Sequence, residues 1–115
     1  MGTSVDAGHG MVYWRQELPP LSAEVFGADT IEASSGRVQG GLSHRDDAWV
    51  RCYQDLMART RARLEQEVIR RHGDYAHVRD EVIEARHDEA KSESWLYGRF
   101  QYVLYREPDR ARASA

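Results

Sequence analysis

The segment ESWLYGRFQYVLYR, from Glu93 to Arg106, has apolar side chains at both odd and even positions. Successive side chains of a strand point to opposite faces, so a strand formed here would be apolar on both faces. One face would carry Leu96, Gly98, Phe100, Tyr102 and Leu104. The other face would carry Trp95, Tyr97, Arg99, Gln101, Val103 and Tyr105. We therefore predict a central strand that needs a cover on each face.

The strongest local pattern in the chain predicts a long helix. No proline or glycine interrupts the sequence from Asp46 to Arg71, and Ser43 followed by Asp46 resembles a capping box. Gly73 stands where a left-handed C-terminal cap is expected. Cys52 lies at the margin of the apolar side of this helix, where it is expected to be a small packing residue. That side, which is wide enough to lie on a sheet, consists of Trp49, Tyr53, Leu56, Met57, Thr60, Leu64 and Val68.

Two further strands flank the helix in the sequence. Residues 29–34 show a modest strand pattern, followed by a glycine-containing stretch. Residues 74–87 alternate with Ala76, Val78 and Val82 on one face, and a polar connection joins them to the last strand. We therefore predict an α+β fold of β-α-β-β order, with one long helix packed on a three-stranded antiparallel sheet of order 1-3-2 and an N-terminal extended arm.

The length of 115 residues fits a single domain. Pro19 and Pro20 interrupt the apolar segment before the first strand, so this segment is expected to be an extended arm with one helical turn near Ser22. The predicted division is a disordered leader at 1–10, a single α+β domain at 11–106 with the arm at 11–28 and the β-α-β-β core at 29–106, and a disordered tail at 107–115.

The two faces of the last strand need different covers. We expect the helix on the face of Leu96, Phe100 and Leu104, where Gly98 lets the helix approach closely. Either the aromatic side chains of the arm or a second subunit could cover the opposite face, and the short, proline-interrupted arm favours the second subunit. The predicted interface, or alternatively ligand platform, consists of Trp95, Tyr97, Arg99, Val103 and Tyr105.

Several of these features together resemble a known family. Gly73-Asp74 in HGDYAHV, and Gly98 in LYGRFQYVLYR, occupy the places of a glycine-acidic pair after the helix and a glycine in the last strand of small bacterial YbjQ-like domains. The resemblance covers about residues 29–106. It implies a β-α-β-β subunit that assembles through its sheets into a ring or similar homo-oligomer, and it implies the heavy-metal-binding role suggested for such domains. The arm, the aromatic content and the charged hairpin depart from the family pattern.

Composition narrows the classes of partner. The apolar fraction of 41% with 30% charged residues is typical of a folded domain. The net charge of -3 gives no general attraction to nucleic acid or anionic lipid, and no stretch approaches the ~20 apolar residues of a membrane span. Cys52 is the only cysteine, so an internal disulfide is excluded and a reducing, cytoplasmic location is expected. We predict neither a nucleic-acid partner nor a membrane partner.

Candidate chemistry is sparse. The sequence has no phosphate loop, dinucleotide fingerprint or nucleophile elbow. His77 and His87 would lie ~33 Å apart along a straight strand, too far to share a metal ion. We predict no catalytic residue, no metal site and no cofactor; enzyme activity through His44 or His77 is a third hypothesis. The leading hypothesis is a non-enzymatic homo-oligomeric assembly or interaction module, and the alternative is a small-molecule or metal-ion binding protein with a site at a subunit interface.

Overall fold

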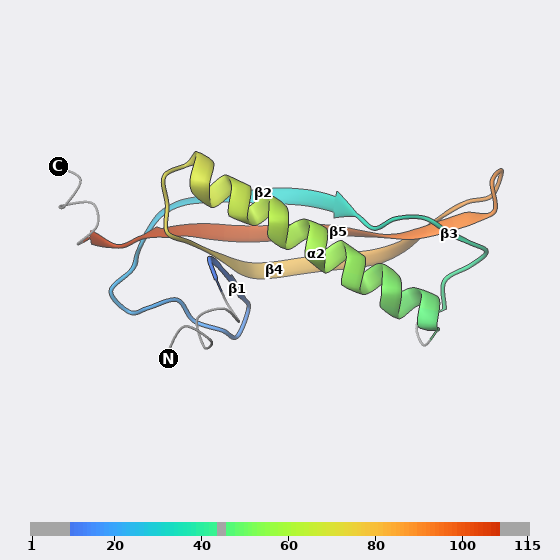
Figure 1. The fold of residues 1–115 in the computed structure, drawn as a ribbon, viewed down its shortest axis with the longest axis horizontal. Helices are drawn as coiled ribbons and strands as arrows, with labels where there is room; N and C mark the ends of the chain where they lie inside the picture. Colours follow the sequence, from blue (N-terminus) through green and yellow to red (C-terminus); the bar gives the residue numbers. More distant parts are fainter. Residues whose placement is uncertain (1–9, 44–45, 109–115) are drawn as a thin grey trace.

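The computed structural model describes residues 10–43 and 46–108. These residues form an α+β fold with one long helix beside a mixed five-stranded sheet (Figure 1). The elements in chain order are β1 (Val12–Trp14), β2 (Glu24–Ser34), β3 (Val38–Gln39), α2 (Asp47–Arg70), β4 (Tyr75–Asp88) and β5 (Glu93–Arg106). The predicted leader and tail fall almost wholly outside the described residues, as does His44.

β5 is the middle strand of the sheet. It is antiparallel to β4 on one side and to β2 on the other, and the short β3 also pairs with it. β1 pairs with the other edge of β4 in parallel, with Val12 opposite Ala76. The three strands expected from the sequence, β2, β5 and β4, lie side by side in the predicted order 1-3-2 and are antiparallel. The prediction of a wholly antiparallel sheet of three strands is nevertheless wrong, because the observed sheet has five strands, with order β1-β4-β5-β2 and β3 also on β5, and the pairing of β1 with β4 is parallel.

The amino-terminal segment contributes more to the sheet than its sequence pattern predicts. The side chain of Val12 is completely buried, so β1 belongs to the core. β2 begins at Glu24 rather than at residue 29. The loop between these strands has a hydrogen-bonded turn at Pro20 in place of the helical turn expected near Ser22. Residues 24–28 of the predicted arm thus belong to the same strand as the first predicted strand.

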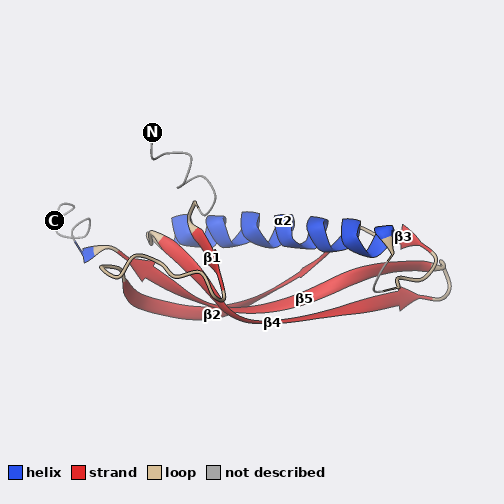
Figure 2. Cartoon of the chain, turned by 90° about the horizontal axis from the view of Figure 1, so that it is seen from below, coloured by secondary structure: helices blue, strands red, loops and turns tan. Residues whose placement is uncertain are grey.

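Helix α2 covers only one face of the sheet (Figure 2). Leu96, Phe100 and Leu104 on that face are at most 1% exposed, which confirms the predicted packing of the helix on this side. The ring of Trp14 meets the ring of Phe100 edge-on, with 6.2 Å between centroids, so the arm packs on the same side as the helix. The helix buries Cys52, Leu56, Thr60, Leu64 and Val68.

The carboxyl end of α2 differs from the prediction by one residue. His72, not Gly73, has the left-handed backbone conformation, with φ of 58°. The Gly73 N–H donates a hydrogen bond to the Val68 carbonyl at 2.8 Å. Gly73 is needed for packing, because a Cβ at this position would lie 2.9 Å from the ring of Phe26.

Replacement of His72 by glycine is expected to raise the free energy of unfolding by about 0.5–1 kcal/mol, since glycine adopts a positive φ without a steric penalty. Chemical denaturation of His72→Gly and the wild type measures the difference. Arg71→Gly is the control: with φ of -94° Arg71 gains nothing from glycine, so this variant should be less stable than the wild type. A loss of stability in His72→Gly equal to that in Arg71→Gly would contradict the prediction.

A bulge in β4 between Val78 and Asp80 changes which side chains share a face. The extra residue, Arg79, shifts the alternation by one position. Val82 consequently points away from α2, on the face opposite to that of Ala76 and Val78. The predicted grouping of Val82 with these two residues is therefore wrong.

The described domain is elongated. Its extents are 56 × 31 × 20 Å, and its radius of gyration is 16.8 Å. A compact chain of this length would have a radius of gyration of about 13 Å. The long hairpin of β4 and β5, with 14 residues in each strand, accounts for the shape and produces a wide sheet with one layer of helix.

Candidate functional site

The face of the sheet that points away from α2, called the outer face below, carries no second layer in the described part of the chain (Figure 2). Its hairpin end lies near the turn between β4 and β5, and its terminal end lies where β5 finishes. β5 contributes Trp95, Tyr97, Arg99, Gln101, Val103 and Tyr105. The flanking strands contribute Val25, Ala28, Thr30, Glu32 and Ser34 from β2, and Tyr75, His77, Asp80, Val82, Glu84 and Arg86 from β4.

Two aromatic side chains at the hairpin end are half-buried beneath arginines. The Arg37 guanidinium lies 4.1 Å from the ring centroid of Trp95, and that of Arg86 lies 3.8 Å from the ring centroid of Tyr97. Partial desolvation and the hydrogen bond to Glu32 raise the pKa of the Tyr97 hydroxyl. One surface of each ring is therefore already occupied by a guanidinium, which gives a cation–π contact instead of an open stacking platform.

The terminal end of the outer face holds a chain of hydrogen bonds around His77. Its Nε2 lies 2.8 Å from the Arg15 carbonyl oxygen, and its Nδ1 accepts a bond of 3.2 Å from Arg79 Nε. A carbonyl only accepts, so Nε2 carries the proton and the ring is neutral. Arg79 Nη2 donates a further bond of 3.1 Å to the Tyr105 hydroxyl. The imidazole, 4% exposed, thus positions the Arg79 guanidinium.

A hollow of about 420 Å³ lies between the two ends of the outer face. The small side chains of Ala28 and Thr30 leave this space beside β5, and Arg79 forms part of its wall. Its volume is within the range of small-molecule sites. The lining residues are Ala28, Asp29, Thr30, Arg79, Gln101, Tyr102 and Val103.

The five residues predicted as an interface or platform lie on the outer face but do not form one site. Trp95 and Tyr105 are ten residues apart on the same strand, a distance of ~33 Å. Trp95 and Tyr97 belong to the hairpin-end cluster, Val103 lines the hollow, and Tyr105 contacts Arg79. Arg99 is exposed between the positions of Glu32 and Val82.

Three arginines that shape the outer face escaped the sequence-based prediction: Arg37, Arg79 and Arg86. Each comes from a segment other than β5, and each meets its aromatic or hydroxyl partner only through the pairing of strands. The sequence carries no local signal for such contacts, because a shift of register by one residue moves every side chain to the opposite face.

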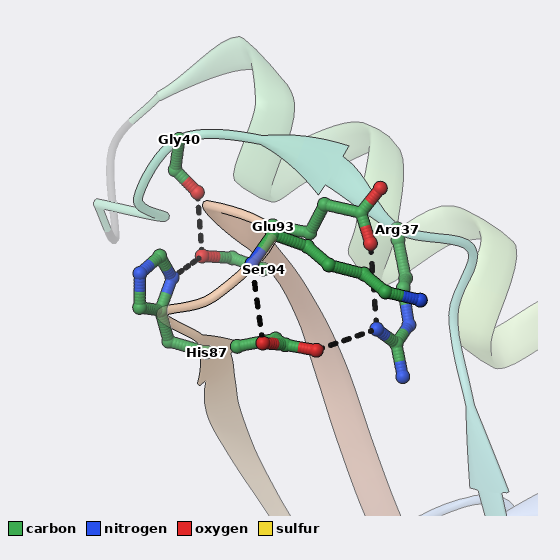
Figure 3. A network of polar contacts seen from close by, with 7 residues as sticks. Arg37, Gly40, His87, Glu93 and Ser94 are labelled. Carbon is green, nitrogen blue, oxygen red and sulfur yellow. Dashed lines mark hydrogen bonds and ion pairs between the residues drawn. The ribbon is translucent and has the colours of Figure 1, made fainter.

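A serine–histidine pair near the hairpin turn was also missed (Figure 3). Ser94 Oγ lies 2.6 Å from the Gly40 carbonyl oxygen and 2.7 Å from His87 Nδ1. The carbonyl can only accept, so the single hydroxyl proton of Ser94 goes to Gly40, and His87 donates to Ser94. A nucleophilic serine requires the reverse arrangement, in which histidine is the base. This pair holds the loop after β3 against the hairpin.

The remaining candidate metal-ligating and nucleophilic side chains do not form a site in the described part of the chain. Among the described residues, no group of three or more His, Cys, Asp or Glu side chains is placed to hold a metal ion. His77 and His87 lie at opposite ends of β4. Cys52 is 3% exposed, with its Sγ 3.8 Å from the Gly36 carbonyl oxygen, which confirms its predicted packing role.

Comparisons of the chain with protein-family models, with curated proteins and with solved structures found no match. The resemblance to YbjQ-like domains therefore stays a prediction, and the functional argument rests on the geometry of the outer face. No helix in the described ranges combines the length and the apolar character needed to cross a membrane.

Proposed function

We propose that this chain is a non-enzymatic assembly module that forms a homo-oligomer through the outer face of its sheet. The observation that carries the proposal is the position of β5, which has apolar or aromatic side chains on both faces and is covered by α2 on only one. A reducing, cytoplasmic location fits the single unpaired cysteine, Cys52.

The arm does not supply the missing cover in the described part of the chain. Trp14 packs against Phe100 on the helix side, and β1 extends the sheet at its edge. On the outer face the chain after β1 meets β4 at His77, through the Arg15 carbonyl. Apart from the arginines over Trp95 and Tyr97, the outer side of β5 from Trp95 to Val103 remains for a second copy to cover.

The charges on the outer face allow it to bind a second copy of itself. It carries Arg79, Arg86 and Arg99 together with the carboxylates of Glu32, Asp80 and Glu84, so charges of both signs are interspersed. A surface with both signs can be complementary to itself across a two-fold axis.

The size of the outer face is adequate for a specific contact. Three strands of about 11–14 residues, at 3.3 Å per residue and 4.8 Å between strands, present roughly 500–650 Å² per copy. Two copies would therefore bury roughly 1,000–1,300 Å² in total, at the lower end of specific interfaces. We expect association that depends on protein concentration.

Size-exclusion chromatography with light scattering, run over a range of concentrations, tests the proposal. We expect Val82→Glu to weaken self-association at least about tenfold, since a carboxylate would be buried in the contact. Val50→Glu is the matched control: Val50 is 44% exposed on α2 and Val82 is 47% exposed on the outer face. Thermal unfolding of each variant verifies that it is folded.

Two results would contradict the proposed assembly. One is a wild-type protein that stays monomeric up to about 1 mM, where even weak specific complexes form. The other is an oligomer that Val82→Glu and Val50→Glu weaken equally, because the contact would then lie elsewhere.

A further inference from the structure

We propose that the hollow in the outer face is a binding site for a small organic carboxylate, and that Arg79 contacts the carboxylate group. The inference goes beyond assembly and rests on a different observation. This observation is a positioned guanidinium beside a space of about 420 Å³.

The charge of Arg79 is not neutralised by any described carboxylate. Its guanidinium donates hydrogen bonds to the neutral His77 ring and to the Tyr105 hydroxyl. Arg86, in contrast, is paired with Glu84 at 3.2 Å. A guanidinium has five N–H donors, and these two bonds use two of them. The other three can make the paired, charge-assisted hydrogen bonds that arginine forms with carboxylates.

The Arg79 side chain is held in place before any ligand arrives. Arg79 is the extra residue of the β4 bulge, and His77 is itself fixed by its bond to the Arg15 carbonyl. Bulges commonly re-aim a side chain toward a site. Because the guanidinium is already oriented, less conformational entropy is lost on binding than with a freely rotating side chain.

The other residues that line the hollow indicate the chemical character of the ligand beyond its carboxylate group. Val103 and Ala28 offer an apolar floor, while Gln101 and Thr30 add side chains that can form hydrogen bonds. Asp29 also lines the hollow, but it pairs in register with Tyr102, so its carboxylate points to the α2 side of the sheet. One cation beside an apolar floor fits a monocarboxylate with an apolar body.

Benzoate is a suitable probe, with benzamide as its neutral counterpart. Titration of ¹⁵N-labelled protein, followed by the backbone amide signals of Ala28, Thr30, Gln101 and Val103, should show saturable binding of benzoate and much weaker binding of benzamide. Arg79→Gln should weaken benzoate binding at least about tenfold. Arg79→Lys should restore part of the affinity, because it keeps the charge without the planar fork.

Arg99→Gln is the control, because Arg99 lies on the same face outside the lining of the hollow. Three results would overturn the proposal. They are a wild type that does not bind benzoate, a wild type that binds benzoate and benzamide equally, and an affinity for benzoate that Arg79→Gln and Arg99→Gln lower equally. The proposal would also be overturned if the wild type were an oligomer that does not bind benzoate and Arg79→Gln dissociated it. In that case the carboxylate that contacts Arg79 would be a side chain of the second copy. A monomer that binds benzoate through Arg79 would instead refute the assembly proposal alone.

Discussion

Gly98→Ala is expected to lower the free energy of unfolding by about 1–3 kcal/mol, the usual effect of overpacking a dense core. A Cβ at this position would lie 2.6 Å from Phe100 Cε2 and 3.2 Å from Leu56 Cδ2. All three residues are buried in the layer between α2 and β5, and Leu56 and Phe100 are completely inaccessible to solvent. Alanine would otherwise favour a strand over glycine, so a net loss of stability would show that the contact with the ring outweighs this preference.

Urea denaturation of the purified variants measures this effect. Gly41→Ala is the control, because no atom lies within 4 Å of a Cβ at that position and its φ is not left-handed. In a Phe100→Leu background, where the ring is absent, Gly98→Ala should lose about 1 kcal/mol less stability than in the wild type, as expected for neighbours that share a contact. Additive effects of the two substitutions would show that the ring of Phe100 does not limit the space at Gly98.

The parts of the fold that the sequence predicted depend on local periodicity. The apolar side of α2 follows from a repeat of 3.6 residues, and its members Leu56, Leu64 and Val68 are all buried. The two-sided character of β5 follows from a repeat of two, which placed Leu96 and Phe100 correctly on the helix side. Both patterns are properties of one continuous segment, so they can be recognised without knowing the partner of that segment.

The parts that the sequence did not predict depend on pairing between distant segments. β1 is only three residues long and is stabilised by its parallel register with Ala76 to Val78, more than 60 positions further along the chain. The bulge at Arg79 shifts β4 by one residue without a glycine or proline to mark it. Each of these features is decided by tertiary contacts, which override weak local preferences.

For the candidate site, as for the fold, the sequence predicted what depends on the alternation within one strand and did not predict what depends on neighbouring strands. The alternation of β5 places Trp95, Tyr97, Val103 and Tyr105 on one face, and the structure has them there. The division of that face into an arginine-covered end and a hollow could not be predicted. It depends on the small residues that β2 brings beside β5 and on the β4 bulge that directs Arg79, and both are set by register.

Alkaline pH is expected to lower the free energy of unfolding, because the Tyr75 hydroxyl, which lies where β5 finishes, ionises. Burial of its ring, followed by its hydrogen bond of 3.1 Å to Glu107, raises the pKa of the Tyr75 hydroxyl from 10.0 to about 12. The folded state therefore favours the protonated hydroxyl more than the unfolded chain does. Its contribution to stability is fully present below pH 10 and is lost as the pH rises from 10 to about 12.

The size of this effect follows from the shift. Each unit of pKa corresponds to 1.36 kcal/mol, and because Tyr75 is only half-buried we expect about 1–2 kcal/mol of stability to be lost across that range. Ionisation would also place a negative charge beside Glu107, whose N–H is bonded to Asp74 at 2.7 Å. The segment that follows β5 should detach first, because Tyr75 and Asp74 both hold it.

Urea denaturation at pH 9 and at pH 11.5 tests this prediction in the wild type and in Tyr75→Phe. The wild type should lose about 1–2 kcal/mol more stability than the variant between the two pH values, since phenylalanine has no proton to release. Tyr53→Phe, which removes a hydroxyl from the amino-terminal half of α2, is the control and should lose as much as the wild type. If Tyr75→Phe also loses as much as the wild type, the alkaline transition is governed by another group and the bond between Tyr75 and Glu107 does not couple β4 to the chain after β5.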